Sequence, residues 1–328
     1  MMNQLIEKFP EQLTTALEIG KKTKQAKPLN PFTQVVVSGL GGSGIGASIV
    51  QEYVYDKLKI PFVVNKEYFI PATVGKTTLF IACSYSGNTE ETLHSVQLAK
   101  KAGAYIICIT SGGQLEQFAL KHKLTLYLIP NNMPPRACLG YSLVQILFSL
   151  KKAGLLKTSF EKEIQGAIQI LTKSSKTIRQ RGKKLAAQLF NKQVAIYTVA
   201  GREGLAIRFR QQLNENSKVL CWHNVIPEMT HNEIVGWRIN KPDVCTVYCY
   251  SKSDYSRNLT RMGILQKVTK SCQATQAQLI IEGNNFWEQC FYFIHFTDWV
   301  SVELAELYHH DAVEVKVIDH LKNQLSKK

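Results

Sequence analysis

The stretch Thr78-Leu79-Phe80-Ile81-Ala82-Cys83-Ser84-Tyr85-Ser86-Gly87-Asn88-Thr89 decides the fold of this 328-residue chain. Residues 78–83 form a continuous apolar run, which predicts a strand of a parallel sheet that is buried on both faces. The amphipathic run 90–102 predicts a helix. A glycine and three small hydroxyl side chains therefore lie between the end of a strand and the start of a helix. Backbone N–H groups and the helix dipole favour a phosphate at such a place.

The same alternation of strand and helix extends along most of the chain. Strands are also predicted at 35–37, 61–64, 105–109, 124–129, 193–199, 218–222, 244–250 and 279–282. A long helical region, 143–192, is broken near Gly154 and divides the two groups of strands. We expect an α/β protein with two doubly wound domains, whose mainly parallel sheets are covered by helices on both faces. The predicted segments are an N-terminal helix (1–28, with Gly20 as its stop), a first domain (29–155), connecting helices (156–190) and a second domain (191–328).

Composition and cysteine content indicate an ordinary globular protein. Hydrophobic residues make up 45% of the chain and charged residues 20%, which is typical of a folded chain long enough for two domains. The N-terminus lacks the pattern of an export signal, and no apolar run approaches the roughly 20 residues that span a bilayer. The eight cysteines are scattered and lack the paired spacing of a zinc site. We expect a soluble, cytoplasmic protein with buried thiols, no metal and no membrane partner.

The net charge of +15 raises the question of a nucleic-acid partner. The densest basic runs, 21–27 and 179–184, contain no aromatic residues that would stack on bases. A solvated surface is therefore favoured over nucleic-acid binding. Attraction of a small anionic substrate is a further use for this charge.

A second glycine-rich loop, residues 39–46, follows the strand predicted at 35–37. Its spacing fits the dinucleotide pattern G-x-G-x-x-G. The acidic residue that would bind a ribose is missing, however, because the next strand leads into Asn65-Lys66. A sugar phosphate explains both loops, since Ser43 would converge with Ser84, Ser86 and Thr89 on one phosphate. Helix capping and tight turns are the alternative explanation, and they use the same geometry.

Five segments together resemble one family of enzymes. They are Gly41-Gly42-Ser43-Gly44, residues 84–92, Pro135-Arg136-Ala137, Asn214-Glu215-Asn216-Ser217-Lys218 and residues 227–236. Over residues 30 to 325 the chain resembles the bifunctional phosphoglucose/phosphomannose isomerases, which consist of two sugar isomerase (SIS) domains. The resemblance implies interconversion of glucose 6-phosphate and mannose 6-phosphate with fructose 6-phosphate. The route is ring opening followed by proton transfer through an enediolate, without metal or redox cofactor.

The resemblance also implies a role for each candidate site residue. Glu215 would be the base that moves the carbon-bound proton, and Arg136 would stabilise the enediolate. His231 would open the ring and, in a homodimer with shared active sites, would come from the neighbouring subunit. From the residues alone, each has a simpler reading: a solvated carboxylate for Glu215, an exposed arginine on a proline turn for Arg136 and a surface histidine for His231.

The remaining roles implied by the family concern binding. Substrate binding is expected of Gly42, Ser43, Ser84, Ser86 and Thr89. Near the C-terminus, relatives are expected to carry a lysine followed by Asp-Pro, but this chain reads His309-His310-Asp311-Ala312. His310 either takes over the role of that lysine or is a surface histidine. Arg202 is a weaker candidate for a similar loop in the second domain and stands outside the catalytic set.

Three other functions compete with the isomerase. A non-catalytic SIS-domain regulator would bind the phosphorylated hexose and do no chemistry, but the chain shows no helix-turn-helix segment and has both candidate catalytic residues. An isomerase that makes glucosamine 6-phosphate would carry an additional glutaminase domain. A nicotinamide-dependent oxidoreductase leaves the hydroxyl-rich loop at 84–89 unexplained.

Overall fold

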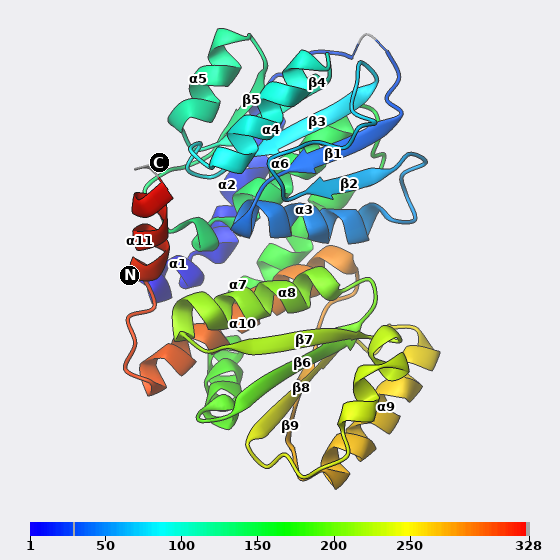
Figure 1. The fold of residues 1–328 in the computed structure, drawn as a ribbon, viewed down its shortest axis with the longest axis vertical. Coiled ribbons are helices and arrows are strands. Elements are labelled where there is room, and N and C mark those ends of the chain that lie inside the picture. The colour runs from blue at the N-terminus through cyan, green and yellow to red at the C-terminus, as the bar shows by residue number, and fades with distance from the viewer. Residues whose placement is uncertain (29, 326–328) are drawn as a thin grey trace. The chain divides into compact units, whose positions relative to one another are not determined.

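The computed structural model describes residues 1–28 and 30–325, and the chain forms two α/β units (Figure 1). The first, which we call the N-unit, comprises residues 8–172 and 284–288. The second, the C-unit, comprises residues 1–7, 173–283 and the chain from 289 onward. The long helices α7 (Phe160–Leu189) and α10 (Phe286–Leu307) each contribute residues to both units.

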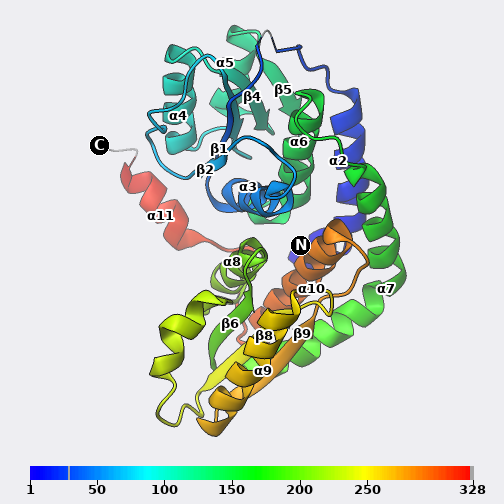
Figure 2. The ribbon, with the colours of Figure 1, turned by 90° about the vertical axis from the view of Figure 1, so that its right-hand side faces the viewer.

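The N-unit contains a five-stranded parallel sheet with the strand order β2-β1-β3-β4-β5. The strands are β1 (Gln34–Ser38), β2 (Phe62–Asn65), β3 (Thr78–Cys83), β4 (Tyr105–Thr110) and β5 (Thr125–Leu128). Every residue of β1 and β3 is buried, as expected for central strands covered on both faces. The helices are α2 (Phe9–Lys22), α3 (Gly41–Val54), α4 (Glu90–Lys101), α5 (Gly113–Lys121) and α6 (Leu139–Lys152). Figure 2 shows α4 and α5 on one side of this sheet and α2 and α6 on the other.

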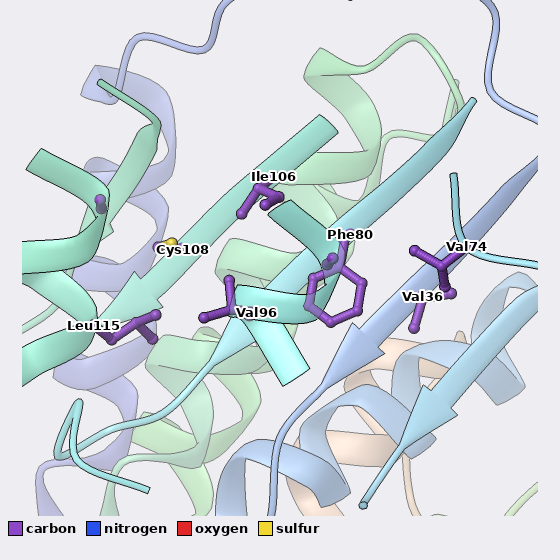
Figure 3. Packing of buried hydrophobic residues seen from close by; sticks show 10 residues of the cluster. Val36, Val74, Phe80, Val96, Ile106, Cys108 and Leu115 are labelled. Atoms are coloured by element: carbon purple, nitrogen blue, oxygen red, sulfur yellow. The ribbon is translucent and has the colours of Figure 1, made fainter. Parts of the chain in front are cut away.

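One hydrophobic cluster holds α4 and α5 on the sheet (Figure 3). Phe80 of β3 and Ile106 of β4 meet Val96 of α4 and Leu115 of α5, and all four side chains are almost completely buried. Full burial of side chains of this size stabilises the fold by about 1.5–3 kcal/mol each. The cluster therefore fixes the start of α4 relative to the end of β3, which is where residues 84–89 lie.

The C-unit contains a four-stranded parallel sheet with the order β7-β6-β8-β9. The strands are β6 (Gln193–Val199), β7 (Cys221–Ile226), β8 (Val244–Tyr250) and β9 (Thr275–Ile280). The remaining α-helices are α1 (Met2–Glu7), α8 (Glu203–Gln212), α9 (Ser256–Ser271) and α11 (Lys316–Leu325). Met262 and Leu265 of α9 pack into a core with Tyr197 and Tyr248. None of the helices described in residues 1–28 and 30–325 has the length and apolar character that a membrane span requires.

The apolar runs predicted several elements closely. The strands at 78–83, 193–199 and 244–250 are confirmed with the same boundaries. The predicted break in the long helical region is also confirmed, because Gly154 has φ +77 between α6 and α7. All eight cysteines are free thiols and only Cys221 is not fully buried, in agreement with the expectation of buried thiols.

Three predicted elements differ clearly from the structure. The N-terminal region contains two helices instead of one, and Gly20 lies inside α2, where a Cβ would stand 1.9 Å from the ring of Phe148. The strand predicted at 218–222 begins only at Cys221, because Lys218 adopts the left-handed conformation (φ 60). The last strand covers 275–280 instead of 279–282, because it alternates between buried and more exposed residues and so lacks a continuous apolar run.

Candidate active site

The hydroxyl-rich loop lies at the carboxyl end of β3, next to the carboxyl end of β1. The hydroxyls of Ser84 and Thr89 are hydrogen-bonded at 2.8 Å, and the hydroxyl of Ser86 accepts the N–H of Asn88 at 3.2 Å. Thr89 is the residue before α4, yet its hydroxyl pairs with Ser84 instead of capping the helix. Simple capping therefore does not account for Thr89, and the first N–H groups of α4 point to the edge where these hydroxyls gather.

Gly87 makes the sharp turn of this loop possible. Its φ is +68, and a Cβ would lie 1.8 Å from the carbonyl oxygen of Gly112. Both the backbone conformation and the close approach of the loop after β4 exclude a side chain at this position. A side chain at residue 87 would therefore force the loop to change shape.

Ser43 lies in the first turn of α3, directly after β1, and is buried. The carboxyl end of β3, where Cys83 lies, is adjacent to the end of β1 that precedes this turn. Burial raises the pKa of Cys83 to about 12, although hydrogen bonds with Ser43 and Ser142 partly oppose this. The thiol is therefore neutral at physiological pH and does not repel an anion at this edge of the sheet.

Arg136 lies in the short 3-10 helix Pro135–Ala137, which packs against the first turn of α3. A Cβ on Gly42 would stand 3.2 Å from the carbonyl oxygen of Pro135 and 3.9 Å from Cα of Arg136. Arg136 is only 4% exposed, so its simpler reading as an exposed arginine is wrong. The structure therefore brings Gly42, Ser43 and Arg136 together beside the hydroxyl-rich loop.

Lys66 is a neighbour that the sequence analysis missed. It follows β2, and its Cε would lie 3.5 Å from a Cβ on Gly44 in the first turn of α3. Its position in the sequence, directly after Asn65, speaks only against a ribose-binding acid. Lys66 could have been predicted from the sheet topology. The carboxyl ends of β2 and β1 are adjacent in the sheet, so a residue that follows β2 lies near the loop that follows β1.

In the C-unit, Glu215 lies on a π-helical turn, Leu213–Ser217, which follows α8. The neighbouring side chains hold this turn in place. Asn216 donates to the hydroxyl of Ser301 at 2.9 Å, and Ser217 donates to the carbonyl of Ser301 at 2.6 Å. Asn214 donates to the carbonyl of Val219 at 2.7 Å. Single π-helical turns are rare and are frequent at functional sites.

Lys218 fastens the end of the same turn. Its ammonium donates to the carbonyl of Glu215 at 2.6 Å, of Asp311 at 3.0 Å and of Glu314 at 2.8 Å. The turn is thereby tied to the segment that leads into α11. Glu215 itself is partly buried and lines a pocket of about 500 Å³. The other lining residues are Asn214, Lys218, Val219, Leu220, Glu314, Val315, Val317 and Ile318.

The two predicted histidines lie in separate parts of the C-unit. His231 is exposed and ends the 3-10 helix Glu228–His231, which follows β7. His310 is exposed in the segment that follows α10, where its backbone N–H donates to the carbonyl of Ala305 at 2.9 Å and its ring stacks on Tyr308. His310 directly precedes Asp311, whose carbonyl accepts from Lys218. The structure thus places His310 in the segment that is tied to the Glu215 turn, and His231 in a different loop.

The C-unit also has counterparts of the two N-unit loops. In both sheets the first strand lies between the second and the third, so the loops after β6 and β8 correspond to those after β1 and β3. Here Arg202 Nε contacts Asp254 Oδ1 at 2.8 Å, and its Nη2 donates to Gln289 at 2.6 Å. The other oxygen of Asp254 accepts the N–H of Ser251 at 2.7 Å. A buried carboxylate of the chain itself therefore occupies this edge of the C-unit sheet.

Comparisons with known proteins agree with this division. Residues 30–149 match the model of the SIS domain, and residues 178–325 match that of the bacterial phospho-glucose isomerase C-terminal SIS domain. The chain is 38% identical to the bifunctional phosphoglucose/phosphomannose isomerase of Caldicellulosiruptor bescii, over 99% of each chain. It belongs to the bifunctional phosphoglucose/phosphomannose isomerase family. The enzyme of that name from Aquifex aeolicus is 34% identical over 92% of this chain and 93% of its own length.

Solved structures support the same fold for this isomerase-family chain. The C-terminal domain of glucosamine-fructose-6-phosphate aminotransferase from Francisella tularensis superposes with a TM-score of 0.75 at 13% identity, covering 95% of this chain and 98% of its own. Tagatose-6-phosphate ketose/aldose isomerase from Escherichia coli gives a TM-score of 0.69 at 15% identity, covering 95% and 94%. The predicted family and the predicted fold of two SIS-type domains are confirmed.

Proposed function

We propose that this chain is an aldose–ketose isomerase that interconverts glucose 6-phosphate and mannose 6-phosphate with fructose 6-phosphate. The observation that carries the proposal is the setting of Glu215. This carboxylate lies on a π-helical turn whose other polar side chains form hydrogen bonds within the C-unit, and it lines a pocket of about 500 Å³. The relatives over nearly the full chain bear the name of this activity.

The N-unit supplies the binding half of the proposal. The hydroxyls of Ser43, Ser84, Ser86 and Thr89 and the N-terminus of α4 bind the phosphate of the sugar. Hydrogen bonds from hydroxyl and backbone N–H groups to a dianion are stronger than neutral ones, and the helix dipole adds to them. The buried guanidinium of Arg136 provides the cation that stabilises the enediolate.

The C-unit supplies the proton transfers. Isomerisation of the open-chain aldose moves one proton from C2 to C1 and one from O2 to O1, so it needs no redox partner. Glu215 takes the proton from C2 and returns it to C1. His231, supplied by the neighbouring subunit of a homodimer, exchanges a proton with the ring oxygen during ring opening. The homodimer and a cytoplasmic location are parts of the proposal.

The role of Glu215 is tested by Glu215→Gln in assays with glucose 6-phosphate and mannose 6-phosphate in parallel, with EDTA present. Loss of a general base lowers kcat by about 10²–10⁴-fold, and we expect this for both sugars. Glu314→Gln is the matched control, because Glu314 lines the same pocket and its amide oxygen would still accept the N–H of Lys316. Near-normal turnover by Glu215→Gln would remove the residue from the mechanism. A wild-type protein that binds both sugars but converts neither would instead identify a regulator.

Sharing of sites between subunits is tested by mixing the inactive variants Glu215→Gln and His231→Ala. After subunit exchange, half of the sites in a mixed dimer would receive both wild-type residues, so roughly a quarter of the wild-type activity should return in a 1:1 mixture. Recovery is measured as turnover of fructose 6-phosphate against time of mixing. A mixture that exchanges subunits and stays inactive would place both residues of one site on the same chain.

A further inference from the structure

The loop that carries His231 is anchored on both sides of the exposed imidazole. Two residues before it, Met229 is completely buried in the core of the C-unit. Two residues after it, Glu233 begins the 3-10 helix Glu233–Gly236, and Asn232 caps that helix by accepting the N–H of Glu233 at 2.6 Å. The position of His231 therefore depends on how firmly these two neighbours are held.

The carboxylate of Glu233 is bound to the sheet through both of its oxygens. Oε1 accepts hydrogen bonds from the hydroxyl of Tyr197 at 2.5 Å and from Nε1 of Trp222 at 3.1 Å. Oε2 accepts from Nδ2 of Asn224 at 2.6 Å. These donors come from β6 and β7, and Trp237 donates in turn to the hydroxyl of Tyr197 at 3.2 Å. The network thus ties two strands to the loop that follows β7.

Each of these bonds depends on an acceptor at Glu233. Tyr197 is fully buried, and burial together with the neighbouring Glu233 raises its pKa well above the usual range. The phenol therefore stays protonated and donates. The indole of Trp222 and the amide nitrogen of Asn224 are donors only. A carboxylate satisfies all three donors at once, whereas a glutamine would set its own amide nitrogen against one of them.

We propose that Glu233 is the positioning residue for His231, and that it acts by anchoring the loop that presents the imidazole. The proposal rests on the proposed role of His231 in ring opening. Glu233 does not itself transfer protons, because both of its oxygens are committed to donors of the sheet. Its effect is geometric, since a catalytic group displaced by about 1 Å costs on the order of 10²-fold in rate.

The test is a double-mutant cycle of Glu233→Gln and His231→Ala, with kcat and KM measured on cyclic glucose 6-phosphate. We expect Glu233→Gln alone to lower kcat by about 10–100-fold with little change in KM. In the His231→Ala background it should cause no further loss, because the group that it positions is already absent. Fully multiplicative effects would overturn the inference.

Two further variants separate this role from general stability. Glu228→Gln is the control on the same loop, because Glu228 is exposed and the new amide oxygen would still accept from Asn232; its kinetics should match the wild type. Trp222→Phe removes one donor while keeping an aromatic ring, and it should lower kcat by about threefold with the same dependence on His231. If Glu233→Gln does not fold, Trp222→Phe replaces it in the double-mutant cycle with His231→Ala.

The outcomes distinguish the inference from the function on which it rests. If His231→Ala retains full turnover, the proposed role of His231 fails, and any loss in Glu233→Gln then overturns the positioning role as well. If His231→Ala loses activity but folded Glu233→Gln does not, only the positioning role is overturned. Loss in both single variants without further loss in the double variant supports the inference.

Discussion

The loop after β3 in the N-unit and the loop after β8 in the C-unit follow corresponding strands, because the first strand lies between the second and the third in both sheets. The two loops nevertheless place different side chains at the sheet edge. The N-unit loop gathers the small hydroxyls of Ser84, Ser86 and Thr89 around a tight glycine turn. The C-unit loop places Asp254 against Arg202 at the corresponding edge. The N-unit loop thus presents neutral hydroxyls at this edge of its sheet, whereas the C-unit fills the corresponding edge with an ion pair of its own.

The difference also gives a reason why the proposed function assigns phosphate binding to the N-unit and proton transfer to the C-unit. An edge that already holds a buried carboxylate does not accept a phosphate as well, because two anions would lie close together in a region of low dielectric. The C-unit offers other positions instead, namely the π-helical turn of Glu215 and the loop of His231. In the proposed function, the N-unit therefore binds the phosphate and the C-unit supplies the acid–base groups.

Of the changes that test this comparison, Arg202→Ala should have the largest effect, a loss of free energy of unfolding. It leaves the carboxylate of Asp254 buried without its cation, and removing one partner of a buried ion pair costs about 3–5 kcal/mol. Urea unfolding would measure this loss. The double variant Arg202→Ala/Asp254→Ala should recover part of it, because the unpaired charge is gone. A loss below about 1 kcal/mol for the single variant would show that the ion pair does not hold this edge closed.

A pair of glycine substitutions should have an intermediate effect. Gly87→Ala would force its Cβ against the carbonyl of Gly112, so the cradle must change shape, and we expect phosphosugar affinity to fall at least tenfold, about 1.4 kcal/mol. Gly201→Ala, after β6, meets no described atom within 4 Å and carries only the strain of φ +85, which costs about 1 kcal/mol of stability. Titration calorimetry with fructose 6-phosphate compares them. Equal affinities would mean that the shape of the 84–89 loop does not matter for binding.

The smallest effect is expected from two matched serines. Ser86→Ala removes one exposed hydroxyl from the proposed cradle, and a single hydrogen bond of this kind contributes about 1 kcal/mol, or roughly a fivefold rise in KM. Ser253→Ala removes a hydroxyl from the closed C-unit loop, where it accepts from Gln289 at 3.1 Å; KM should not change. If KM rises equally in both variants, the assignment of the phosphate to the N-unit loop is wrong.

The sequence predicted the framework better than the details of the sites. Strands such as 78–83 were found because a strand buried on both faces reads as a continuous apolar run. The burial of Arg136 was not foreseen, because a proline-rich turn indicates exposure and only the close packing of Gly42 reveals otherwise. The network of Glu233 and the ion pair of Arg202 were also missed. Tyr197 lies 36 residues from Glu233 and Asp254 lies 52 residues from Arg202, so no local pattern joins them. The catalytic and binding roles of the site residues stay predictions.

The contacts of Lys218 join segments that are made at different times during synthesis. Its ammonium binds carbonyls that lie 93 and 96 residues further along, at Asp311 and Glu314. During synthesis, N-terminal segments emerge and fold first, so the residues proposed to bind the phosphate emerge long before the partners of Lys218. The turn of Glu215 receives these two hydrogen bonds only after residues 311–314 have left the ribosome. With the proposed roles, a nascent chain would contain the residues that bind a phosphorylated sugar before the turn that carries the proposed base is fully held.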